Sequence, residues 1–567
     1  MNSKLDTKVV EYIREAAKSE RLATYLKRML VELVKFNTAP DDDSYATASR
    51  EKAFFDWVER EVKQIAGQEI TVERPAIDPR IADDPAYSPP GYAAGPGGQV
   101  PPSGQVYAGR TNLIIQVSGQ APQSRPSAIL HAHADVVSPW FGPREAGSRV
   151  FGRGSCDNKA QIAVILAELK LLGELHQKLG YEPAGGFVIQ LAIDEEIGGN
   201  GSLSLTMDPR FAGLPVLMLE STDLVPYCAH RGAVYYRCRL SSRGLPNVGA
   251  VEMFPLVVYQ LEKEGRRIKE ETNAPLFTPD HVQTNHGVLG PYGKHPGSVC
   301  DHVALELIAR SGAKPERMAM KMGEFFEDAL AEYVKVYGDK TKVTDSATGK
   351  PKVARHFDIK VLPNATTQNF RIDIYGKSGH MAAVADCDSA ITKAAYLLGG
   401  LLRIAPNFPN IKATGRFADG GGDDQEIVLE GGQGFTPSHR MADIQDRMAG
   451  AARRGVESYC KLRRFKFNEA MVHMSFDRLH NDAYADTPDS VPMQALKAAF
   501  AAIGSPWPQP VAWQTSCDAR IYHHKGHPVA IFGAGKLEAA HGVDEYVDIP
   551  DLQQALAVST LATLALT

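Results

Sequence analysis

Residues 111–222 alternate between short apolar runs and a long helical pattern, and this alternation constrains the fold more than any other feature of the chain. The short runs read TNLIIQVSG, SAILHAHADVV, GGFVIQLAIDEE and LPVLMLEST, and the helical pattern reads NKAQIAVILAELKLLGELHQKL. Short apolar runs that are separated by long helices are typical of parallel strands whose two faces are covered by helices. We therefore predict an α/β fold with a central, mostly parallel sheet flanked by helices.

The same alternation returns near the C-terminus, after a long interruption. After about residue 465 the chain reads as the strand MVHMSF, the helix VPMQALKAAFAAIG, the strand PVAIFGAG and a closing helix. The interruption is mixed: VALELIARSG and MKMGEFFEDALAEYVKVYG both show apolar residues at helical spacing. Because 567 residues exceed one ordinary core, we predict an α/β domain formed by residues 1–238 and 468–567, with a second, α+β domain at 239–467.

The segment before the first strand has two parts of different character. Apolar residues between Thr7 and Phe36, and again between about Ala48 and Ala66, recur at steps of three and four, which predicts amphipathic helices. Residues 74–110 are dense in proline and glycine, which disfavour helices and strand ladders. We expect a long surface loop there and leave open whether it lies near a site or contacts a partner.

Composition excludes several classes of protein. Hydrophobic residues at 44% and charged residues at 23% are ordinary for a globular chain, which argues against a mainly disordered or coiled-coil protein. The net charge of −5 gives no general attraction to a polyanion, so nucleic acid is not an expected partner. Seven scattered cysteines, the lack of an apolar leader and the lack of an 18-residue apolar run predict a cytoplasmic protein that does not enter a membrane.

Polar clusters follow the predicted strands, at the edge where α/β sheets bind ligands. His131, His133 and Asp135 lie in LHAHADVV. Imidazole is a common zinc ligand, and a neighbouring carboxylate can fix its tautomer, although a short His-x-Asp pattern also arises by chance. Asp157 lies in FGRGSCDNKA at the start of a helix, where its carboxylate could bind a cation or simply cap the helix.

Three further clusters complete this pattern. LAIDEEIGGNGS places Glu195 and Glu196 directly after an apolar strand, where one glutamate could bind a metal while the other transfers a proton, and where a solvated turn is the alternative. Glu220 ends another apolar run, and His541 lies in a loop after PVAIFGAG. Nitrogen and oxygen ligands of this kind suit two divalent ions, with zinc favoured by the imidazoles. The candidate ligands are His133, Asp157, Glu196, Glu220 and His541.

The motifs HAHADVV, GRGSCDNKA, DEEIGGNGS, LESTDLVPYCAHRG, GKSGH, TSCDAR and AHGVDEYV stand in the order found in a known family. The chain thereby resembles the dinuclear zinc aminoacylase/carboxypeptidase family of metallopeptidase clan MH, whose members include acetylornithine deacetylase, succinyl-diaminopimelate desuccinylase, carboxypeptidase G and carnosinase. The resemblance covers the first α/β segment and about the last hundred residues. It implies a zinc-peptidase-like catalytic domain at 1–238 and 468–567, interrupted by a lid domain.

Carried over residue by residue, the resemblance implies two metal ions, zinc in the first place, with cobalt or manganese as alternatives. His133 and Glu220 would bind one ion, Glu196 and His541 the other, and Asp157 both. Asp135 would orient His133. Glu195 would be the general base that takes a proton from a water bridging the metals and returns it to the leaving amine. The family also implies a cis peptide bond between Asp157 and Asn158.

Three assignments have competing interpretations. Glu220 matches the acetylornithine deacetylase pattern, whereas Asp223, three residues later, is the weaker candidate for the same metal. GKSGH resembles the lid motif whose histidine stabilises the oxyanion, often across a dimer interface, which would assign that role to His380. A surface histidine is the alternative. Arg520 matches a family position near the substrate and could bind a carboxylate or form a structural ion pair.

The chain also departs from the family pattern between its two α/β segments. About 135 residues separate AVYYRCRL from GKSGH, where the family usually has a short connection, so the lid carries a large insertion. EGGQGFTP matches the family's lid strand only weakly, and SHRMADIQDRMAGAARR reads as a helix where a strand with an arginine normally follows. These departures put lid-mediated dimerisation in question. His281, His286 and His295, in the insertion, show no recognised metal spacing and are expected to be ordinary loop residues.

Together these observations predict a metal-dependent hydrolase that cleaves the amide bond of an N-acyl amino acid or a small peptide. The expected partner is a small-molecule or peptide substrate, and a homodimer is compatible with the pattern. Two alternatives remain: a hydrolytic deaminase that attacks an aryl or amidine carbon, and a metal-free scaffold or binding module. The acyl group and the amine that are recognised cannot be read from these motifs.

Overall fold

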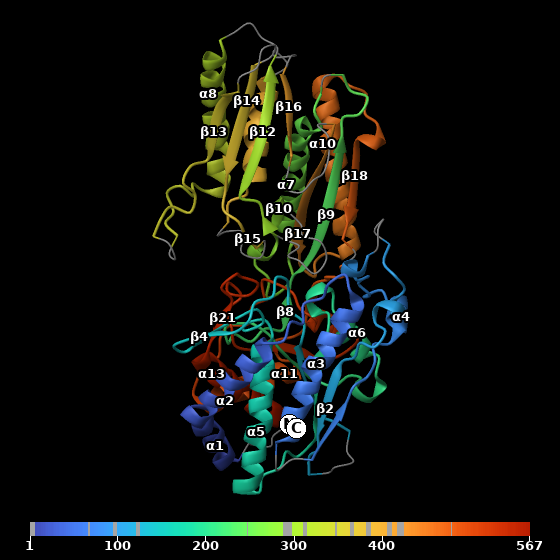
Figure 1. Ribbon diagram of the computed structural model, residues 1–567, viewed down its shortest axis with the longest axis vertical. Helices are drawn as coiled ribbons and strands as arrows, with labels where there is room; N and C mark the ends of the chain where they lie inside the picture. Colours follow the sequence, from blue (N-terminus) through green and yellow to red (C-terminus); the bar gives the residue numbers. More distant parts are fainter. Residues whose placement is uncertain are drawn as a thin grey trace. The chain divides into compact units, whose positions relative to one another are not determined.

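The computed structural model divides into two compact units, whose elements are labelled in Figure 1. Unit 1 comprises the described residues up to 231 and from 479 onward, and unit 2 those from 232 to 477. The structure describes residues 6–65, 69–94, 99–120, 125–246, 248–286, 298–309, 314–345, 349–362, 368–380, 387–404, 411–416, 425–477 and 479–567.

Unit 1 is built on a six-stranded sheet with the order β1-β2-β6-β3-β7-β20. The neighbours β6, β3, β7 and β20 run parallel, while β1 and β2 add antiparallel strands at one edge. The predicted α/β fold with a mostly parallel centre is confirmed, and the C-terminal strand β20 completes a sheet begun by the N-terminal part. The strands are β1 (Ile70–Glu73), β2 (Leu113–Val117), β3 (Ile129–His133), β6 (Phe187–Ala192), β7 (Val216–Leu219) and β20 (Val529–Phe532).

Long helices lie against this sheet, as the sequence predicts. Helix α5 (Lys159–Leu179) is buried over most of its length and packs against α2 (Glu20–Val34) and α13 (Ile549–Leu566), with α1 (Thr7–Ala17) and α11 (Val491–Ile503) alongside (Figure 1). Asp6 caps α1, and Asp43 caps α3 (Ser44–Lys63). Gly180 ends α5 in the left-handed conformation that a glycine adopts without steric cost.

The described residues of the proline- and glycine-rich segment, 74–94 and 99–110, are more buried than a surface loop. They contain the short helices η1 (Pro79–Asp83), η2 (Gly91–Ala93) and α4 (Ser103–Val106). Tyr92, Tyr107 and Arg110 are buried among residues of unit 1. The composition correctly indicates the lack of a long element, but the buried aromatic and arginine side chains contradict the expectation of a surface loop.

Unit 2 contains two four-stranded sheets, each covered by helices. The order of the first is β10-β17-β9-β18, with α7 (Phe254–Glu271) and α10 (Met441–Arg463) against it, and that of the second is β13-β14-β12-β16, with α8 (Pro315–Tyr337) and α9 (Ala390–Ile404). The strands are β9 (Gly232–Ser241), β10 (Thr284–His286), β12 (His302–Ala309), β13 (Phe357–Leu362), β14 (Gln368–Tyr375), β16 (Ile411–Arg416), β17 (Glu426–Phe435) and β18 (Val472–Phe476).

Two sequence expectations in this region are wrong. The run VALELIARSG is expected as a helix, but its residues 303–309 lie in β12, in which Val303, Leu305 and Leu307 are buried at a period of two. MVHMSF, expected in the α/β domain, forms β18 and pairs with β9 inside unit 2. The predicted boundaries at 238 and 467 therefore differ from those in the structure, because β9 and β18 belong to the same sheet.

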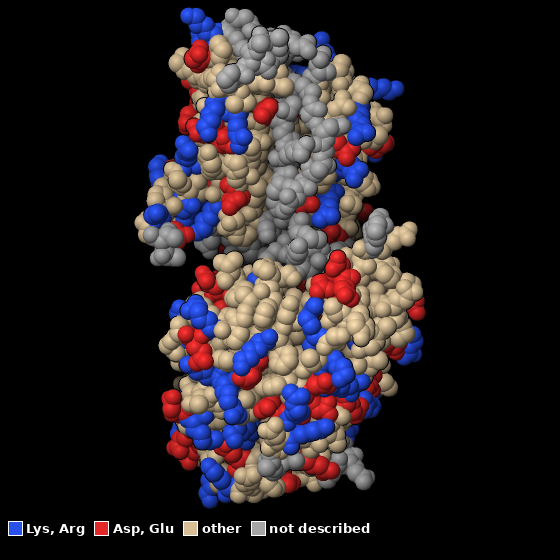
Figure 2. Space-filling view, viewed as in Figure 1, with Lys and Arg blue, Asp and Glu red and all other residues tan. Residues whose placement is uncertain are grey.

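On the face drawn in Figure 2, lysine and arginine side chains are interspersed with aspartate and glutamate in both units. Among the helices that the structure describes, none combines the length and the apolar character that a membrane crossing requires.

Glu168 gives a test of the packing of unit 1. It is buried on α5, and its carboxylate accepts a hydrogen bond from Ser559 Oγ of α13 (2.9 Å). Burial raises the pKa of Glu168 from about 4.5 to about 7. At pH values between 4.5 and 7, Glu168 keeps a proton in the folded chain and releases it in the unfolded chain. The stability that this proton contributes is lost as the pH rises through 7. The free energy of unfolding should fall by about 3 kcal/mol over this range.

Glu168→Gln removes this titration. The unfolding midpoint of the variant, relative to that of the unmodified chain, should rise from pH 5 to about pH 7 and then level off in thermal unfolding. Glu11→Gln, at an exposed position on α1, is the matched control and should show no such trend. If the difference in unfolding midpoint between Glu168→Gln and the unmodified chain does not change with pH, burial does not raise the pKa of Glu168 in the way stated.

Candidate metal centre

The candidate ligands come together at the carboxyl edge of the sheet in unit 1. His133 is the last residue of β3, and Glu196 lies in the turn η3 (Glu195–Ile197) after β6. Glu220 directly follows β7, Asp157 lies just before α5, and His541 lies in the loop after β20. Because parallel strands end at the same edge, residues from distant parts of the sequence reach one location.

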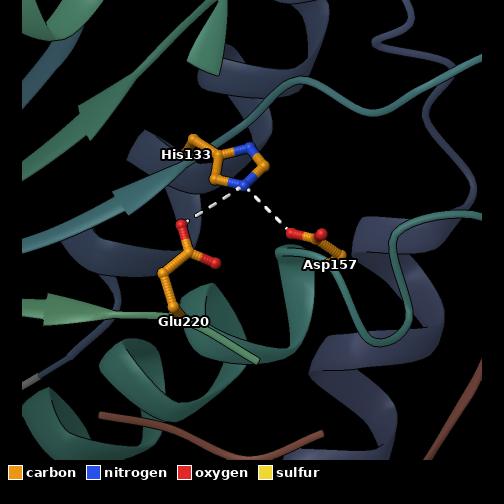
Figure 3. A group of neighbouring side chains, drawn as sticks. All are labelled: His133, Asp157 and Glu220. Atoms are coloured by element: carbon orange, nitrogen blue, oxygen red, sulfur yellow. Dashed lines mark hydrogen bonds and ion pairs between the residues drawn. The ribbon is translucent and has the colours of Figure 1, made fainter. Parts of the chain in front are cut away.

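These ligands form two groups that share one carboxylate. In the first, Nε2 of His133 lies 3.1 Å from Asp157 Oδ1 and 3.7 Å from Glu220 Oε1, and Figure 3 shows the three side chains pointing toward one another. The second group consists of Asp157, Glu196 and His541. Within each group one ligand atom from every residue lies within 4.8 Å of the others.

Asp157 presents a different oxygen to each imidazole. Its Oδ1 faces His133, while its Oδ2 lies 3.3 Å from Nε2 of His541. That same Nε2 lies 3.0 Å from Glu196 Oε2. A carboxylate between two imidazoles, with a further carboxylate on each side, is a donor set that suits two divalent ions.

The carboxylates and imidazoles of this centre influence one another's pKa values. Burial raises the pKa of Glu220 well above its ordinary value, and burial also raises the pKa of Glu196. Burial opposes ionisation of Asp157 as well, but hydrogen bonds to His133 and His541 hold its pKa far below the ordinary value. Despite burial, the neighbouring carboxylates raise the pKa values of both imidazoles. The buried carboxylates outnumber the imidazoles, and bound cations would balance this excess negative charge.

Asp135 orients two parts of the centre at once. Nδ1 of His133 lies 3.1 Å from its backbone oxygen and 3.4 Å from Oδ1. Its carboxylate also accepts hydrogen bonds from the backbone N–H of Glu195 (3.1 Å) and of Glu196 (3.0 Å). The predicted contact of Asp135 with His133 is therefore present, and the two backbone contacts were not anticipated from the sequence.

Glu545 performs a similar function for the loop that carries Asp157. Its Oε1 accepts hydrogen bonds from the N–H groups of Gly154 (2.9 Å), Cys156 (2.9 Å) and Asp157 (3.1 Å), and its Oε2 pairs with the buried Arg153 (2.5 Å). Sequence reasoning missed Glu545, because only His541 was considered in AHGVDEYV. The signal available was an acidic residue next to the apolar residues of a strand.

The peptide bond between Asp157 and Asn158 is cis, which confirms the expectation from the resemblance. The side-chain amide of Asn158 donates hydrogen bonds to Glu220 Oε2 (2.7 Å) and to the backbone oxygen of Leu219 (2.9 Å). Asn158 thus links the loop before α5 to the end of β7. It orients Glu220 toward His133.

Glu195 lies beside the two groups without belonging to either. Its Oε2 is 3.8 Å from Nε2 of His133, and its side chain is 10% exposed. Burial raises its pKa well above the ordinary value, and the buried carboxylate of Asp518 raises it further. Sequence reasoning missed Asp518 as well, because only the arginine of TSCDAR was considered. Burial raises the pKa of Asp518 itself to about 6, against the opposing charge of Arg520.

Three other residues that the sequence singles out, Arg520, Asp223 and His380, are not members of the two ligand groups. The guanidinium of Arg520 is buried and donates to the backbone oxygens of His480 (3.0 Å), Cys517 (2.5 Å) and Gly198 (3.2 Å). Asp223 is exposed, whereas Glu220 lies in the first ligand group. His380 lies in β15 (Gly379–His380) of unit 2, whose backbone pairs with Ser298 of β11 (Ser298–Val299). The side chain of His380 lies outside the described part.

The insertion histidines have separate surroundings. Nε2 of His286 lies 3.1 Å from Glu262 Oε1, and its Nδ1 lies 2.9 Å from the hydroxyl of Tyr236. His281 forms a local contact with Thr278 through its ring nitrogen. Neither histidine is part of a metal group among the described residues, and His295 lies outside those residues.

The ion pair between Arg153 and Glu545 predicts a large effect on stability. Glu545→Ala leaves a buried guanidinium and three backbone N–H groups without their acceptor, which should destabilise unit 1 by about 3–5 kcal/mol and lower its unfolding midpoint by roughly 10 °C. Asp548→Ala is the matched control, because Asp548 pairs with Arg149, which is 46% exposed, and such a pair contributes about 0–1 kcal/mol. Equal midpoints for the two variants in thermal unfolding would contradict this interpretation.

Comparison with known proteins gives matches in sequence and in structure. Residues 129–565 match the sequence profile of Peptidase family M20/M25/M40. A probable carboxypeptidase of Aspergillus clavatus is 28% identical over 150 residues, which cover 24% of this chain and 31% of the relative. An acetylornithine deacetylase of Myxococcus xanthus is 27% identical over 222 residues, which cover 36% of this chain and 56% of the relative. The chain therefore spans between about a third and just over half of the length of these curated relatives.

Among solved structures, human carnosine dipeptidase 1 is similar over nearly the whole chain. The match has a TM-score of 0.51 at 11% sequence identity, and it covers 98% of this chain and 99% of that protein. At this level of identity the similarity establishes the fold.

Proposed function

Because the chain belongs to Peptidase family M20/M25/M40, as its motifs predicted, we propose that it is a metal-dependent hydrolase that cleaves the amide bond of an N-acyl amino acid or a small peptide. The family model spans more than half of the chain. Two of its relatives are named as a probable carboxypeptidase and an acetylornithine deacetylase, and both names denote cleavage of an amide C–N bond. Neither name denotes a deaminase or a scaffold.

The observation that carries the proposal is the position of Asp157 between two imidazoles. His133, Asp157 and Glu220 would hold one divalent ion, and Asp157, Glu196 and His541 the other. Zinc suits the two imidazoles, and cobalt and manganese accept the same donors. When bound, two such ions would lower the pKa of a bound water and polarise the substrate carbonyl.

Glu195 is the proposed proton carrier. Its carboxylate lies beside the ligand atom of His133 but belongs to neither ligand group, so it remains available for proton transfer. As general base it accepts a proton from the attacking water, whose oxygen forms the new bond to the carbonyl carbon. It then donates that proton to the nitrogen as the C–N bond breaks, which releases a carboxylate product and an amine. Asp135 holds the backbone of Glu195 during both steps.

The roles of two further residues follow from the resemblance and from the contacts. The resemblance assigns His380 to the carbonyl oxygen of the substrate, and this role stays a proposal. The three backbone oxygens bound by Arg520 favour a role in holding its loop over a role in binding a substrate carboxylate. We also propose a reducing, cytoplasmic location, which is supported by seven cysteines that are all buried and free.

The proposal predicts that Glu195→Gln binds metal normally and loses activity. A panel of N-acyl amino acids and dipeptides, with product detection by mass spectrometry and with and without chelator, would first identify a cleaved amide. Turnover of Glu195→Gln on that amide should then fall by about 10²–10⁴-fold, because the amide side chain cannot accept the proton. His380→Asn should also lose about a hundredfold in turnover if that histidine stabilises the oxyanion.

Glu182→Gln is the matched control, because the Glu182 side chain is 48% exposed, and it should keep full activity. Near-normal turnover of a metal-loaded Glu195→Gln protein would remove the proposed role of Glu195. Release of ammonia, in place of an amino acid or a peptide fragment, would favour the deaminase alternative. Activity that survives complete metal removal would contradict the proposal as a whole.

A further inference from the structure

A buried ion cluster lies next to the proposed metal centre and takes no part in it. Its core is the guanidinium of Arg110, whose side chain is fully buried between two carboxylates. Arg110 Nε and Nη2 donate to Glu51 (2.8 and 2.5 Å), and Nη2 and Nη1 donate to Asp194 (2.5 and 3.1 Å). The hydroxyls of Tyr107 (2.8 Å) and Tyr92 (3.2 Å) also donate to Asp194 Oδ2. We call these five residues the Arg110 cluster.

The cluster joins three parts of the chain at the residue before Glu195. Glu51 comes from α3, and Asp194 directly precedes the turn η3. Tyr92, Tyr107 and Arg110 come from the proline- and glycine-rich segment 74–110. The four side-chain donors to the Asp194 carboxylate, two from Arg110 and one from each tyrosine, are therefore supplied from outside its own turn.

Asp194 needs such support because of its backbone. Its φ of 62° places it in the left-handed region, which few residues other than glycine adopt. The same turn contains Gly198 and Gly199 at positive φ, and the N–H of Gly199 donates to the backbone oxygen of Asp194 (2.7 Å). A turn of this shape persists where its surroundings over-determine it.

Segment 74–110 also holds the far end of the turn. The side-chain amide of Asn200 donates to the hydroxyl of Tyr107 (2.7 Å) and to the backbone oxygen of Ser88 (2.7 Å). The N–H of Ser88 donates back to Asn200 Oδ1 (3.1 Å). The segment thus binds the chain at residue 194 and at residue 200, on both sides of Glu195 and Glu196.

We propose that segment 74–110 braces the turn that carries Glu195 and Glu196, with Arg110 as the positioning residue that acts through Asp194. The brace holds the turn from one side, while Asp135 holds the backbone N–H groups of both glutamates from the other. The inference rests on the proposed function for its effect on metal and catalysis. We expect loss of the brace to weaken metal binding at the group formed by Asp157, Glu196 and His541. The other group should be unaffected, because His133 and Glu220 are held by other contacts.

Arg110→Met tests the brace, because it removes the guanidinium and keeps much of the side-chain volume. Zinc titration against a competing chromogenic chelator should show one of two sites weakened by about 10–100-fold and the other unchanged. On a cleaved amide, kcat should fall by about a hundredfold while KM changes little, because the glutamates act on the reacting atoms. Arg110→Lys should recover only part of both losses, because an ammonium cannot bind two carboxylates in the manner of a guanidinium.

Hydrogen exchange gives a readout that does not depend on metal or substrate. In metal-free protein, Arg110→Met should speed amide exchange in a peptide spanning residues 193–199, where the N–H groups of Glu195 and Glu196 bind Asp135. Peptides from α13 should keep their exchange rates. This measurement separates the two proposals. Failure to bind zinc would refute the metal centre, whereas hydrogen exchange in the metal-free protein would still test the brace.

Two control variants distinguish positioning from general loss of stability. Leu561→Ala removes a fully buried side chain of α13 and should lower the unfolding midpoint while leaving both zinc sites and kcat intact. Arg210→Met removes an exposed arginine that pairs with Asp208 and Glu73 and should change none of the readouts. If Leu561→Ala weakened one zinc site as Arg110→Met does, the effect would be one of stability, and the brace would be overturned.

Tyr107→Phe keeps the inference testable if Arg110→Met does not fold. It removes only one hydroxyl, which donates to Asp194 and accepts from Asn200. A several-fold weaker second zinc site and faster exchange at residues 193–199 are expected. Zinc affinity, kcat and exchange that all match the unmodified chain, in either folded variant, would overturn the proposal.

Discussion

The position of the Asp157 carboxylate between two imidazoles is the constraint on which the rest of the centre depends. Each oxygen faces one histidine, at 3.1 and 3.3 Å, and the two histidines come from opposite ends of the sequence. This arrangement requires the loop before α5, the end of β3 and the loop after β20 to meet at one edge of the sheet. The sheet order, in which β20 closes a set of strands begun in the N-terminal half, brings them together.

Buried carboxylates that bind backbone N–H groups fix the remaining geometry. Glu545 binds the loop that carries Asp157, and Asp135 binds the turn that carries Glu195 and Glu196. Each of these carboxylates is itself held: Glu545 by Arg153, and Asp135 by its contacts with His133. Such contacts hold the candidate ligands in position, which reduces the reorganisation that metal binding and proton transfer would otherwise require.

The sequence singles out the candidate ligands because their signal is local. His133, Glu196 and Glu220 each follow an apolar run, and apolar runs in an α/β pattern predict strand ends at a common edge. Glu545 and the Arg110 cluster escape this reasoning, because their partners lie far away in sequence and no local pattern marks a buried ion pair. Residues 74–110 show the same limit: proline and glycine predict the lack of long elements but do not report the burial of Tyr92 and Tyr107.

The expectations for β12 and for the domain boundaries differ from the structure for a related reason. Val303, Leu305 and Leu307 alternate as in a strand, but the neighbouring Ala304 and Ile308 make the run apolar enough to imitate a helix. Only pairing with β14 and β16 decides between the two, and pairing is a property of the whole sheet. Likewise, β9 and β18 belong to unit 2 because they pair with each other, across more than two hundred residues of sequence.

The most direct test of the account is the zinc content of the reconstituted chain and of Asp157→Asn, measured by mass spectrometry after removal of unbound metal. Asp157 is the one ligand common to both groups, so its charge supports both ions. The account predicts two zinc ions per chain in the unmodified protein and the weakening of both in Asp157→Asn. An unmodified chain that binds no zinc, or an Asp157→Asn chain that retains both ions at unchanged affinity, would contradict the shared carboxylate as the centre of the site.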